Sequence, residues 1–314
     1  MAAFDDTSIG IFDFHHSMLV DRIRVEAFMR AILATVQPGD VVIDIGTGTG
    51  ILSAFAAIAG ARQVYAIERE PIIDVAREIV ERNGLSDRVI FLEGSSLDIE
   101  LPERGDVLVS ETIGNAAYDE GITRWYRDAK DRLLVDGAAV IPRHLDLEAS
   151  LLTVPNDYEQ IDRWSRPLMH LDLTPLRRVA VNNLLWAELS PAHQSSSIET
   201  VITCDLDDPP GALEGRVEFV ASQAGVAHGL GVWFDAVLDD RTTISNRPPN
   251  VVPSWEQGFL PLAEPVAIQP GDRISATVAV DDDGATWSWR VADGPMQTTR
   301  AGALRRASQI TDGA

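Results

Sequence analysis

The chain has 314 residues, 45% of them hydrophobic, and a formal net charge of −22 at pH 7. That length suits two domains better than one, and the apolar content is enough for a well-buried core. The negative charge disfavours nonspecific binding of nucleic acid, which needs a cationic surface. It favours cationic ligands, although solubility alone is the simpler explanation of the excess.

Cysteine usage and the first residues of the chain indicate a reducing compartment. The single cysteine, Cys204, cannot form an internal disulfide, and its alternating surroundings (ETVITCDL) are typical of a strand. No apolar run approaches the length of a membrane span, and the start of the chain lacks the basic and apolar regions of a secretory signal. We therefore expect a cytoplasmic protein with no membrane partner.

The first predicted element is an amphipathic helix over residues 18–36, ended by Pro38-Gly39. Strand signals (VVIDI, QVYAI, RVIFLEG, DVLVSE) then alternate with helix signals at Leu52–Ala59 and Pro71–Asn83. Such alternation predicts a mostly parallel sheet. The apolar face expected for the first helix contains Leu19, Ile23, Met29, Ile32 and Leu33.

A glycine-rich turn follows the first predicted strand, in the segment Val42–Gly50 (VIDIGTGTG), and Glu68 ends the second strand. Glycines allow a tight turn and a close approach of the backbone to a ligand. An acid at the next strand end is placed to accept hydrogen bonds from ribose hydroxyls. The spacing is G-x-G-x-G rather than the dinucleotide G-x-G-x-x-G, which favours a nucleoside without pyrophosphate, namely S-adenosylmethionine (SAM).

Two acids, Glu111 and Glu120, bracket the segment ETIGNAAYDE after the strand DVLVS. This loop leaves the same edge of the predicted sheet as the glycine turn. Two carboxylates converging there could hold a planar cation through paired N–H···O bonds. In a chain with 48 acidic residues, the alternative is that both are ordinary surface acids.

The pattern changes near Pro142, where period-two alternation and turn residues predict antiparallel strands in a sandwich or barrel. Residues 156–190 interrupt this pattern, and their apolar side chains need cover, either from a second subunit or from their own domain. The tail from Met296 is polar and predicts fraying or a short terminal helix. Its basic residues are Arg300, Arg305 and Arg306.

These motifs together resemble the protein arginine N-methyltransferase family, from about residue 14 to about residue 290. The segment HHSMLVDRIR resembles the family's H-x-x-M-L-x-D-x-x-R, the glycine turn its SAM site, and SETIGNAAYDEGI its loop with two glutamates. RWSRPLMHLDLTPLRR resembles its dimerisation arm. The resemblance implies that His15 and Met18 border SAM and that Arg24 pairs with the SAM carboxylate. It also carries over Asp44, Gly46, Gly48 and Glu68 as SAM-binding residues, and Glu111 and Glu120 as the acceptor clamp.

The chain departs from the family pattern near the acceptor. Residues 112–115 read Thr-Ile-Gly-Asn where the family has Trp-Met-Gly-Tyr, and Ser254 stands where the family's Thr-His-Trp loop has histidine. The acid that would contact adenine falls on Leu97, so Ser96 or a backbone group would serve there. Such departures indicate a divergent, bacterial-type member of the family.

The resemblance implies a Rossmann-like SAM-binding domain over residues 1–141, then a β-barrel domain over 142–314 with a helical dimerisation arm. The implied protein is a homodimeric SAM-dependent enzyme that methylates a guanidino nitrogen, without a metal. One alternative is a small-molecule enzyme acting on free arginine or another amino or guanidino metabolite. The other is a noncatalytic SAM-binding or scaffolding protein.

Overall fold

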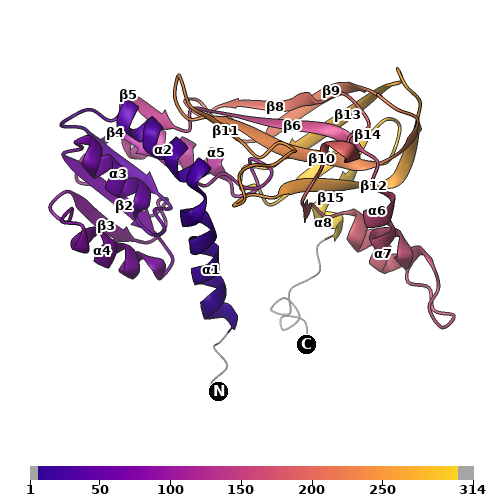
Figure 1. The fold of residues 1–314 in the computed structure, drawn as a ribbon, viewed down its shortest axis with the longest axis horizontal. Coiled ribbons are helices and arrows are strands. Elements are labelled where there is room, and N and C mark those ends of the chain that lie inside the picture. The colour runs from indigo at the N-terminus through magenta and orange to yellow at the C-terminus, as the bar shows by residue number, and fades with distance from the viewer. Residues whose placement is uncertain (1–5, 303–314) are drawn as a thin grey trace. The chain divides into compact units, whose positions relative to one another are not determined.

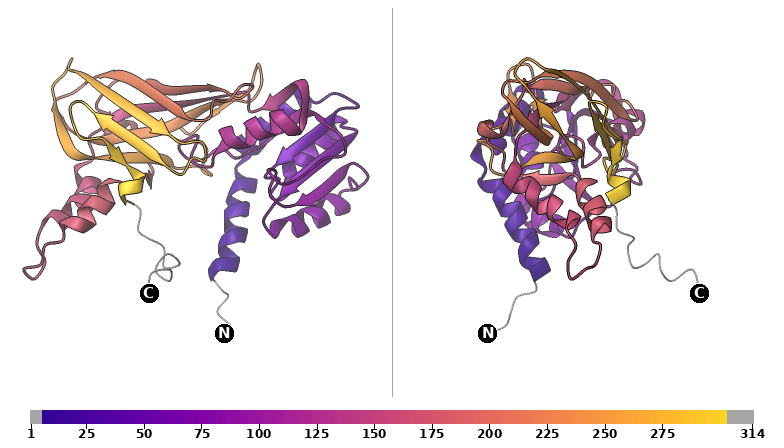
Figure 2. Two further views of the ribbon diagram at one scale, coloured as in Figure 1. Left: turned by 180° about the vertical axis from the view of Figure 1, so that it is seen from behind. Right: turned by 90° about the vertical axis from the view of Figure 1, so that its right-hand side faces the viewer.

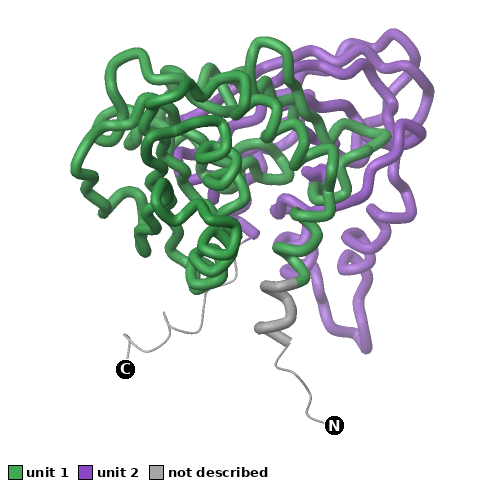
Figure 3. Tube along the Cα trace, turned by 60° about the vertical axis from the view of Figure 1, so that its left-hand side comes forward, with its two compact units in different colours: residues 1–146, 203–211, 234–255 green, residues 147–202, 212–233, 256–314 purple. Residues whose placement is uncertain are grey.

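The computed structural model describes residues 6–302, with side chains from residue 13 onward. By their contacts these residues fall into two compact units, each assembled from several chain segments (Figure 3). The boundary predicted at residues 141 and 142 stays a prediction. Unit 1 comprises residues 1–146, 203–211 and 234–255, and unit 2 comprises 147–202, 212–233 and 256–314.

Unit 1 contains a parallel sheet of five strands in the order β3-β2-β1-β4-β5 (Figure 1). The central strand β1 is buried at every residue, in agreement with its sequence VVIDI, which is apolar except for Asp44. The carboxyl ends of β1, β2 and β4 meet at one edge of the sheet, which is where the glycine turn, Glu68 and the acidic loop begin. The strands are β1 (Val41–Ile45), β2 (Gln63–Glu68), β3 (Val89–Glu93), β4 (Gly105–Val109) and β5 (Leu134–Ile141).

Amphipathic helices pack against this sheet. Helices α3 (Ile51–Ala59) and α4 (Ile72–Arg82) agree with the predicted helices, and α4 turns Ile73, Ala76 and Val80 inward. Helix α5 (Ile122–Arg132) was not predicted, because its sequence ITRWYRDAKDR has few large apolar residues. Its buried side chains are Ile122, Thr123, Tyr126 and Ala129.

The predicted helix over residues 18–36 is in fact two helices, α1 (Asp6–Val20) and α2 (Arg22–Thr35). Asp21 separates them and caps α2, because its Oδ1 accepts a hydrogen bond from the Arg24 backbone N–H at 3.1 Å. A capping carboxylate satisfies one of the unpaired N–H groups of a first turn.

The predicted apolar face of this segment is wrong at three positions. Leu19, Ile23 and Leu33 are 37%, 47% and 46% exposed. The face that α2 buries is made partly of alanines, whose small side chains permit the close contact of α2 with α3. Those buried residues are Ala27, Phe28, Ala31 and Ile32.

Antiparallel sheets of six and four strands make up the strand-rich second half, which confirms the predicted fold class. Their orders are β7-β12-β10-β6-β8, with β11 beside β10, and β15-β14-β13-β9. The unit boundary falls within β6, β8 and β10. The strands are β6 (His144–Leu152), β7 (Leu185–Ala187), β8 (Glu199–Asp205), β9 (Leu213–Val220), β10 (Gly225–Val237), β11 (Thr243–Ser245), β12 (Gln257–Ile268), β13 (Arg273–Val280), β14 (Trp287–Val291) and β15 (Gln297–Thr298).

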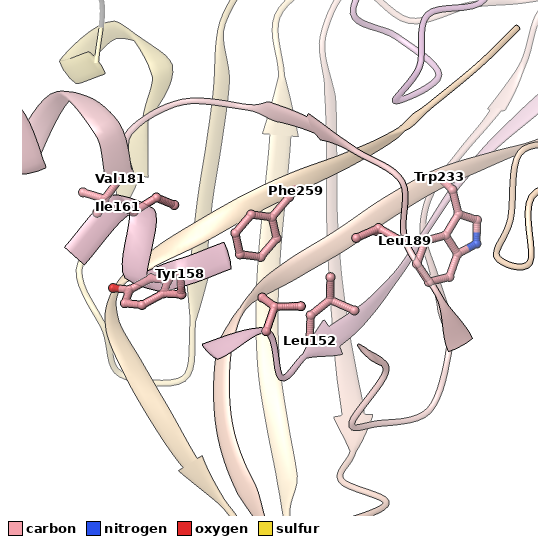
Figure 4. Packing of buried hydrophobic residues seen from close by; sticks show 8 residues of the cluster. Leu152, Tyr158, Ile161, Val181, Leu189, Trp233 and Phe259 are labelled. Atoms are coloured by element: carbon pink, nitrogen blue, oxygen red, sulfur yellow. The ribbon is translucent and has the colours of Figure 1, made fainter. Parts of the chain in front are cut away.

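The segment predicted as an arm forms α6 (Pro155–Asp162), the 3-10 turn η1 (Arg163–Ser165) and α7 (Thr174–Val181). Figure 4 shows that the base of the arm packs on the core of unit 2, where Tyr158, Ile161 and Val181 lie near Phe259. The same cluster continues to Leu152, Leu189 and Trp233. A second 3-10 turn, η2 (Pro191–His193), precedes β8.

The described chain ends in the short helix α8 (Thr299–Gly302). Arg305 and Arg306 of the predicted tail lie outside the described residues. Between residues 6 and 302, no helix combines the length and apolar character needed to cross a membrane.

Candidate active site

The glycine turn after β1 has the left-handed backbone that its sequence predicts. Gly46, Gly48 and Gly50 have φ angles of 73°, 54° and 80°, which strain residues with side chains. The backbone N–H groups of Gly46 and Thr47 both donate to the Ile67 carbonyl, at 2.9 and 3.1 Å. The turn is thereby fixed against β2, and its three glycines have no side chain that would block a ligand.

Asp44 lies beneath this turn and is 1% exposed. Its Oδ2 accepts hydrogen bonds from the hydroxyls of Thr47 and Ser53, both at 2.6 Å. Its Oδ1 is buried and has no hydrogen-bond partner. Burial raises the pKa of Asp44 to about 6, against the opposing effect of the two hydroxyls. A buried acceptor without a partner is costly, so this atom is suited to a donor that a ligand brings.

Glu68 stands at the end of β2 with its carboxylate held by backbone donors. Oε2 accepts from the Gly48 N–H at 2.9 Å, and Oε1 accepts from the N–H groups of Arg69 and Glu70 at 2.8 and 2.9 Å. Each carboxylate oxygen has further acceptor capacity. The bonds orient Glu68 beside the glycine turn, as expected of a group that binds a ribose.

Helix α1 brings His15 to the glycine turn and Met18 to Arg24. A Cβ added to Gly48 would lie 3.4 Å from His15 Cε1, so the imidazole lies directly against the turn. Burial lowers the pKa of His15, while Glu68 opposes that shift. The Met18 carbonyl accepts a hydrogen bond from Arg24 Nη1 at 3.1 Å.

Arg24 forms an ion pair with Glu111 through Nη2, and the two side chains are only 11% and 8% exposed. Its guanidinium carbon also lies 5.4 Å from the centroid of the Trp255 ring. Desolvation lowers the pKa of Arg24 to about 10, so it is still cationic at neutral pH. Arg24 Nε is buried without a partner and can donate to an anionic ligand group. The sequence assigned Arg24 and Glu111 to different ligands, whereas the structure joins them directly.

Asp119 stabilises the loop between Glu111 and Glu120 by a hydrogen bond to its backbone. Its Oδ1 accepts from the Ala116 N–H at 2.8 Å, and a Cβ on Gly114 would lie 2.1 Å from the same oxygen. Only glycine fits there. Glu120 follows directly. Its side chain is exposed, yet desolvation by the surrounding protein raises its pKa to about 7. Asp119 adds to that shift, while Arg24 opposes it.

Ser96 is buried after β3, with its carbonyl accepting from Arg132 Nη2 at 2.7 Å. Its neighbour Leu97 is half-buried. No contact of either side chain identifies it as an adenine-binding group, so a role for Ser96 in the cofactor site stays a prediction.

Three residues that support the site were not assigned to it from the sequence, and all lie in unit 1. Asn246 is fully buried, and its Nδ2 donates to the Asn115 carbonyl at 2.8 Å. Trp255 Nε1 donates to the Ile113 carbonyl at 2.9 Å, so both donors hold the acidic loop by its backbone. Asp21 Oδ2 accepts from the Ser254 hydroxyl at 2.6 Å. The cap signal before RIR could have identified Asp21, but no local pattern marks Asn246.

We expect Asn246→Ala to lower kcat by roughly tenfold, because losing the hydrogen bond from its Nδ2 to the Asn115 carbonyl costs about 1–3 kcal/mol and loosens the acidic loop. The affinity for SAM, measured by calorimetry, should change little. Asn83→Ala, which removes the side-chain bond to the Ile79 carbonyl at the end of α4, is the matched control. Equal kcat values for the two variants would contradict a role of Asn246 in positioning the loop.

Family profiles match both halves of the chain. One described as ribosomal protein L11 methyltransferase (PrmA) covers residues 26–128, and one described as arginine methyltransferase oligomerization subdomain covers residues 149–288. Probable protein arginine N-methyltransferase 6 of Arabidopsis thaliana is 32% identical over 270 residues, which are 77% of this chain and 60% of that protein. Histone-arginine methyltransferase CARMER of Drosophila grimshawi is 30% identical over 291 residues, covering 87% of this chain and 53% of that protein. The chain thus spans little more than half the length of these relatives.

Solved structures share the fold. A Trypanosoma brucei PRMT1 enzyme–prozyme heterotetrameric complex with AdoHcy superposes with a TM-score of 0.82 at 23% identity, over 90% of this chain and 96% of that one. Arabidopsis thaliana protein arginine methyltransferase 10 gives a TM-score of 0.77 at 23% identity, with the same coverage. The parallel sheet with its glycine turn and strand-end acid has the class I methyltransferase fold. Within that class, the chain belongs to the protein arginine N-methyltransferase family, which confirms the resemblance seen in the sequence.

Proposed function

We propose that this protein is a SAM-dependent N-methyltransferase that methylates a guanidino nitrogen of an arginine-type acceptor. The observation that carries the proposal is the Arg24–Glu111 ion pair, in which Glu111 already holds a guanidinium at the carboxyl edge of the sheet. Glu120 ends the same loop and supplies a second carboxylate. Paired, charge-assisted hydrogen bonds of this kind suit a planar cation.

The residues around the glycine turn fit SAM. Glu68 would accept hydrogen bonds from the ribose hydroxyls of SAM, and the free Arg24 Nε would donate to the SAM carboxylate. Asp44 Oδ1 would accept a hydrogen bond from the ammonium group of SAM, which explains why this buried oxygen has no partner within the protein. The backbone of Gly46 and Gly48, with His15, Met18 and Ser96, would border the remainder. When bound, SAM supplies an electrophilic methyl group on a sulfonium.

The protein's own contribution is alignment and charge. Glu111 and Glu120 would orient the acceptor so that its nitrogen points at the methyl carbon, where an N–C bond forms as the S–C bond breaks. Their negative charges would stabilise the cationic acceptor. Glu120, with its pKa raised to about 7, can accept the proton that the nitrogen loses.

A second candidate is a small-molecule methyltransferase, favoured by the acceptor-side residues Thr112 and Asn115, which are smaller than the aromatic residues expected there. A labelled-SAM assay with free arginine, arginine peptides and fractionated cell extract separates the two. Label on peptides or proteins supports the proposal, and label on metabolites alone supports the alternative. Absence of transfer to any acceptor would leave only a SAM-binding role.

The raised pKa of Glu120 predicts a pH dependence. Because the carboxylate must be ionised to bind a cation, kcat/KM for the acceptor should rise with pH through an apparent pKa of about 7. Below that pH the protonated acid loses its charge and activity falls. The variant Glu120→Gln, which cannot titrate, should lack this rise. A wild-type profile that is flat between about pH 6 and pH 8 would contradict the assignment.

We also propose that the arm forms a symmetric homodimer. Leu168, Met169 and Leu171 at its tip are 60%, 85% and 65% exposed, which is costly for a patch without a partner. Sedimentation at micromolar concentration should show a dimer, and replacing all three residues by serine should give monomers with weak activity. Arg166→Ser, an exposed polar residue of the same arm, is the control. A monomeric wild type would contradict the proposal.

A cytoplasmic setting agrees with the state of Cys204. The thiol is free and buried, and desolvation raises its pKa to about 12, which makes it unreactive. A reducing compartment is therefore the setting we propose. Cell fractionation of the native protein tests it.

A further inference from the structure

The outer face of the four-stranded sheet in unit 2 carries two arginines in one row. Thr277 of β13 is paired with Arg216 of β9 on one side and with Arg290 of β14 on the other. Strand β13 buries alternate residues, including Ala276 and Val278, so Thr277 points away from the core. The two arginines flank its hydroxyl on the same face.

A hollow of about 250 Å³ lies over this row. Its lining includes Arg216 and Arg290, the hydroxyl-bearing Ser275 and Thr277, and one acid, Asp293. The whole site is built from β9, β13, β14 and the turn after β14, all within unit 2. It is separate from the glycine turn and the acidic loop, which belong to unit 1.

Neither guanidinium has a partner among the residues that the structure describes. Other arginines near this sheet are neutralised, since Arg273 pairs with Glu218 and Arg300 with Asp281. Asp293 lies in the lining, but it forms no ion pair with either arginine. The two arginines face each other across β13 and are both exposed, in a chain with 48 acids against 26 basic residues. Two unpaired cations facing one hollow therefore suggest that an anion lies between them.

We propose that this hollow binds a phosphate group. Each guanidinium offers several N–H donors in a planar fork that matches phosphate oxygens, and Thr277 brings a hydroxyl on the strand between the two arginines. A phosphate carries up to two negative charges and enough oxygens for both forks, whereas a single carboxylate has one charge and two oxygens. The source is free phosphate or a phosphorylated residue of a peptide. The site does not depend on the proposed methyl transfer.

Calorimetry with inorganic phosphate, in a low-salt buffer that contains no other multivalent anion, tests the site. Wild type should bind with a Kd in the millimolar range, and Arg216→Gln or Arg290→Gln should each weaken binding roughly tenfold. Asp293→Asn should tighten it several-fold, because it removes the one acid of the lining. Arg273→Gln, on the same sheet but already paired with Glu218, should leave the Kd unchanged.

A second titration distinguishes the two sources. A phosphoserine peptide that binds at least about tenfold more tightly than inorganic phosphate identifies a phosphorylated peptide as the ligand, and equal affinities identify free phosphate. The same peptide with unmodified serine should not bind. The proposal is overturned if wild type releases no heat with either phosphate compound, or if the Arg216 and Arg290 variants bind as wild type does. The melting temperatures of the Arg216, Arg290 and Asp293 variants should equal that of wild type, which would show that a loss of binding is not caused by unfolding.

Discussion

Glu120→Gln should lower kcat at least about a hundredfold, which corresponds to about 2.7 kcal/mol, while SAM affinity stays close to that of wild type. The substitution keeps the side-chain volume but removes a negative charge from the place where the acceptor cation binds. Glu120 makes no hydrogen bond to a residue of the glycine turn, so the cofactor side should be unaffected. Single-turnover rates and calorimetry with SAM separate the two effects.

Glu111→Gln should lower kcat by a similar factor and also weaken SAM binding. The sequence alone predicted an effect on the acceptor only. The structure changes that expectation because Glu111 neutralises the buried guanidinium of Arg24. Breaking a buried pair leaves an uncompensated charge, which is strongly destabilising. Arg24 would then be less well held for the SAM carboxylate.

Glu93→Gln is the control for both variants, since Glu93 is an exposed acid at the end of β3 on the same edge of the sheet. It removes one charge nearby without touching Glu111 or Glu120, and its kcat should equal that of wild type. Near-normal turnover in Glu120→Gln would refute the guanidinium clamp. A large loss of SAM affinity in Glu120→Gln would assign that acid to the cofactor instead.

The parts of the fold that local pattern determines were predictable. A buried central strand has a mostly apolar sequence, and a left-handed turn favours glycine. The acid ending QVYAIE stands beside the turn because neighbouring parallel strands end at one edge. Each of these requirements is satisfied within a few consecutive residues. The positions of Gly46, Gly48 and Glu68 at that edge therefore follow from sequence.

The contacts that complete the site are not local. Asn246 and Asn115 are 131 positions apart, and Glu111 and Arg24 are 87 apart. No hydrophobic periodicity or motif spacing in the sequence predicts such pairs, because tertiary packing alone brings them together. The face that α2 buries was not predicted for a related reason. Large apolar residues dominate a hydrophobic pattern, whereas Ala27 and Ala31 are buried because they are small enough for close helix contact.

Glu68→Ala should weaken SAM binding by roughly ten- to a hundredfold. Two ribose hydroxyls would lose their acceptor, at a cost of about 1–3 kcal/mol. The Gly48 N–H, now bonded to Glu68 Oε2 at 2.9 Å, would lose its partner as well, so the glycine turn itself should loosen. Calorimetry with SAM measures the first effect, and hydrogen exchange at the Gly48 amide measures the second.

Glu70→Ala is the matched control, because it removes an equal charge two residues away from an exposed side chain. A Kd for SAM that rises equally in both variants would mean that net charge, rather than the ribose contact, governs affinity. Unchanged binding in Glu68→Ala would remove Glu68 from the cofactor site. If the contact is real, adenosine should lose affinity in Glu68→Ala by about the same factor as SAM, while 2′-deoxyadenosine, which lacks one of the two hydroxyls, should lose less. That difference between two nucleosides depends on the ribose hydroxyl alone, so a general loosening of the glycine turn cannot reproduce it.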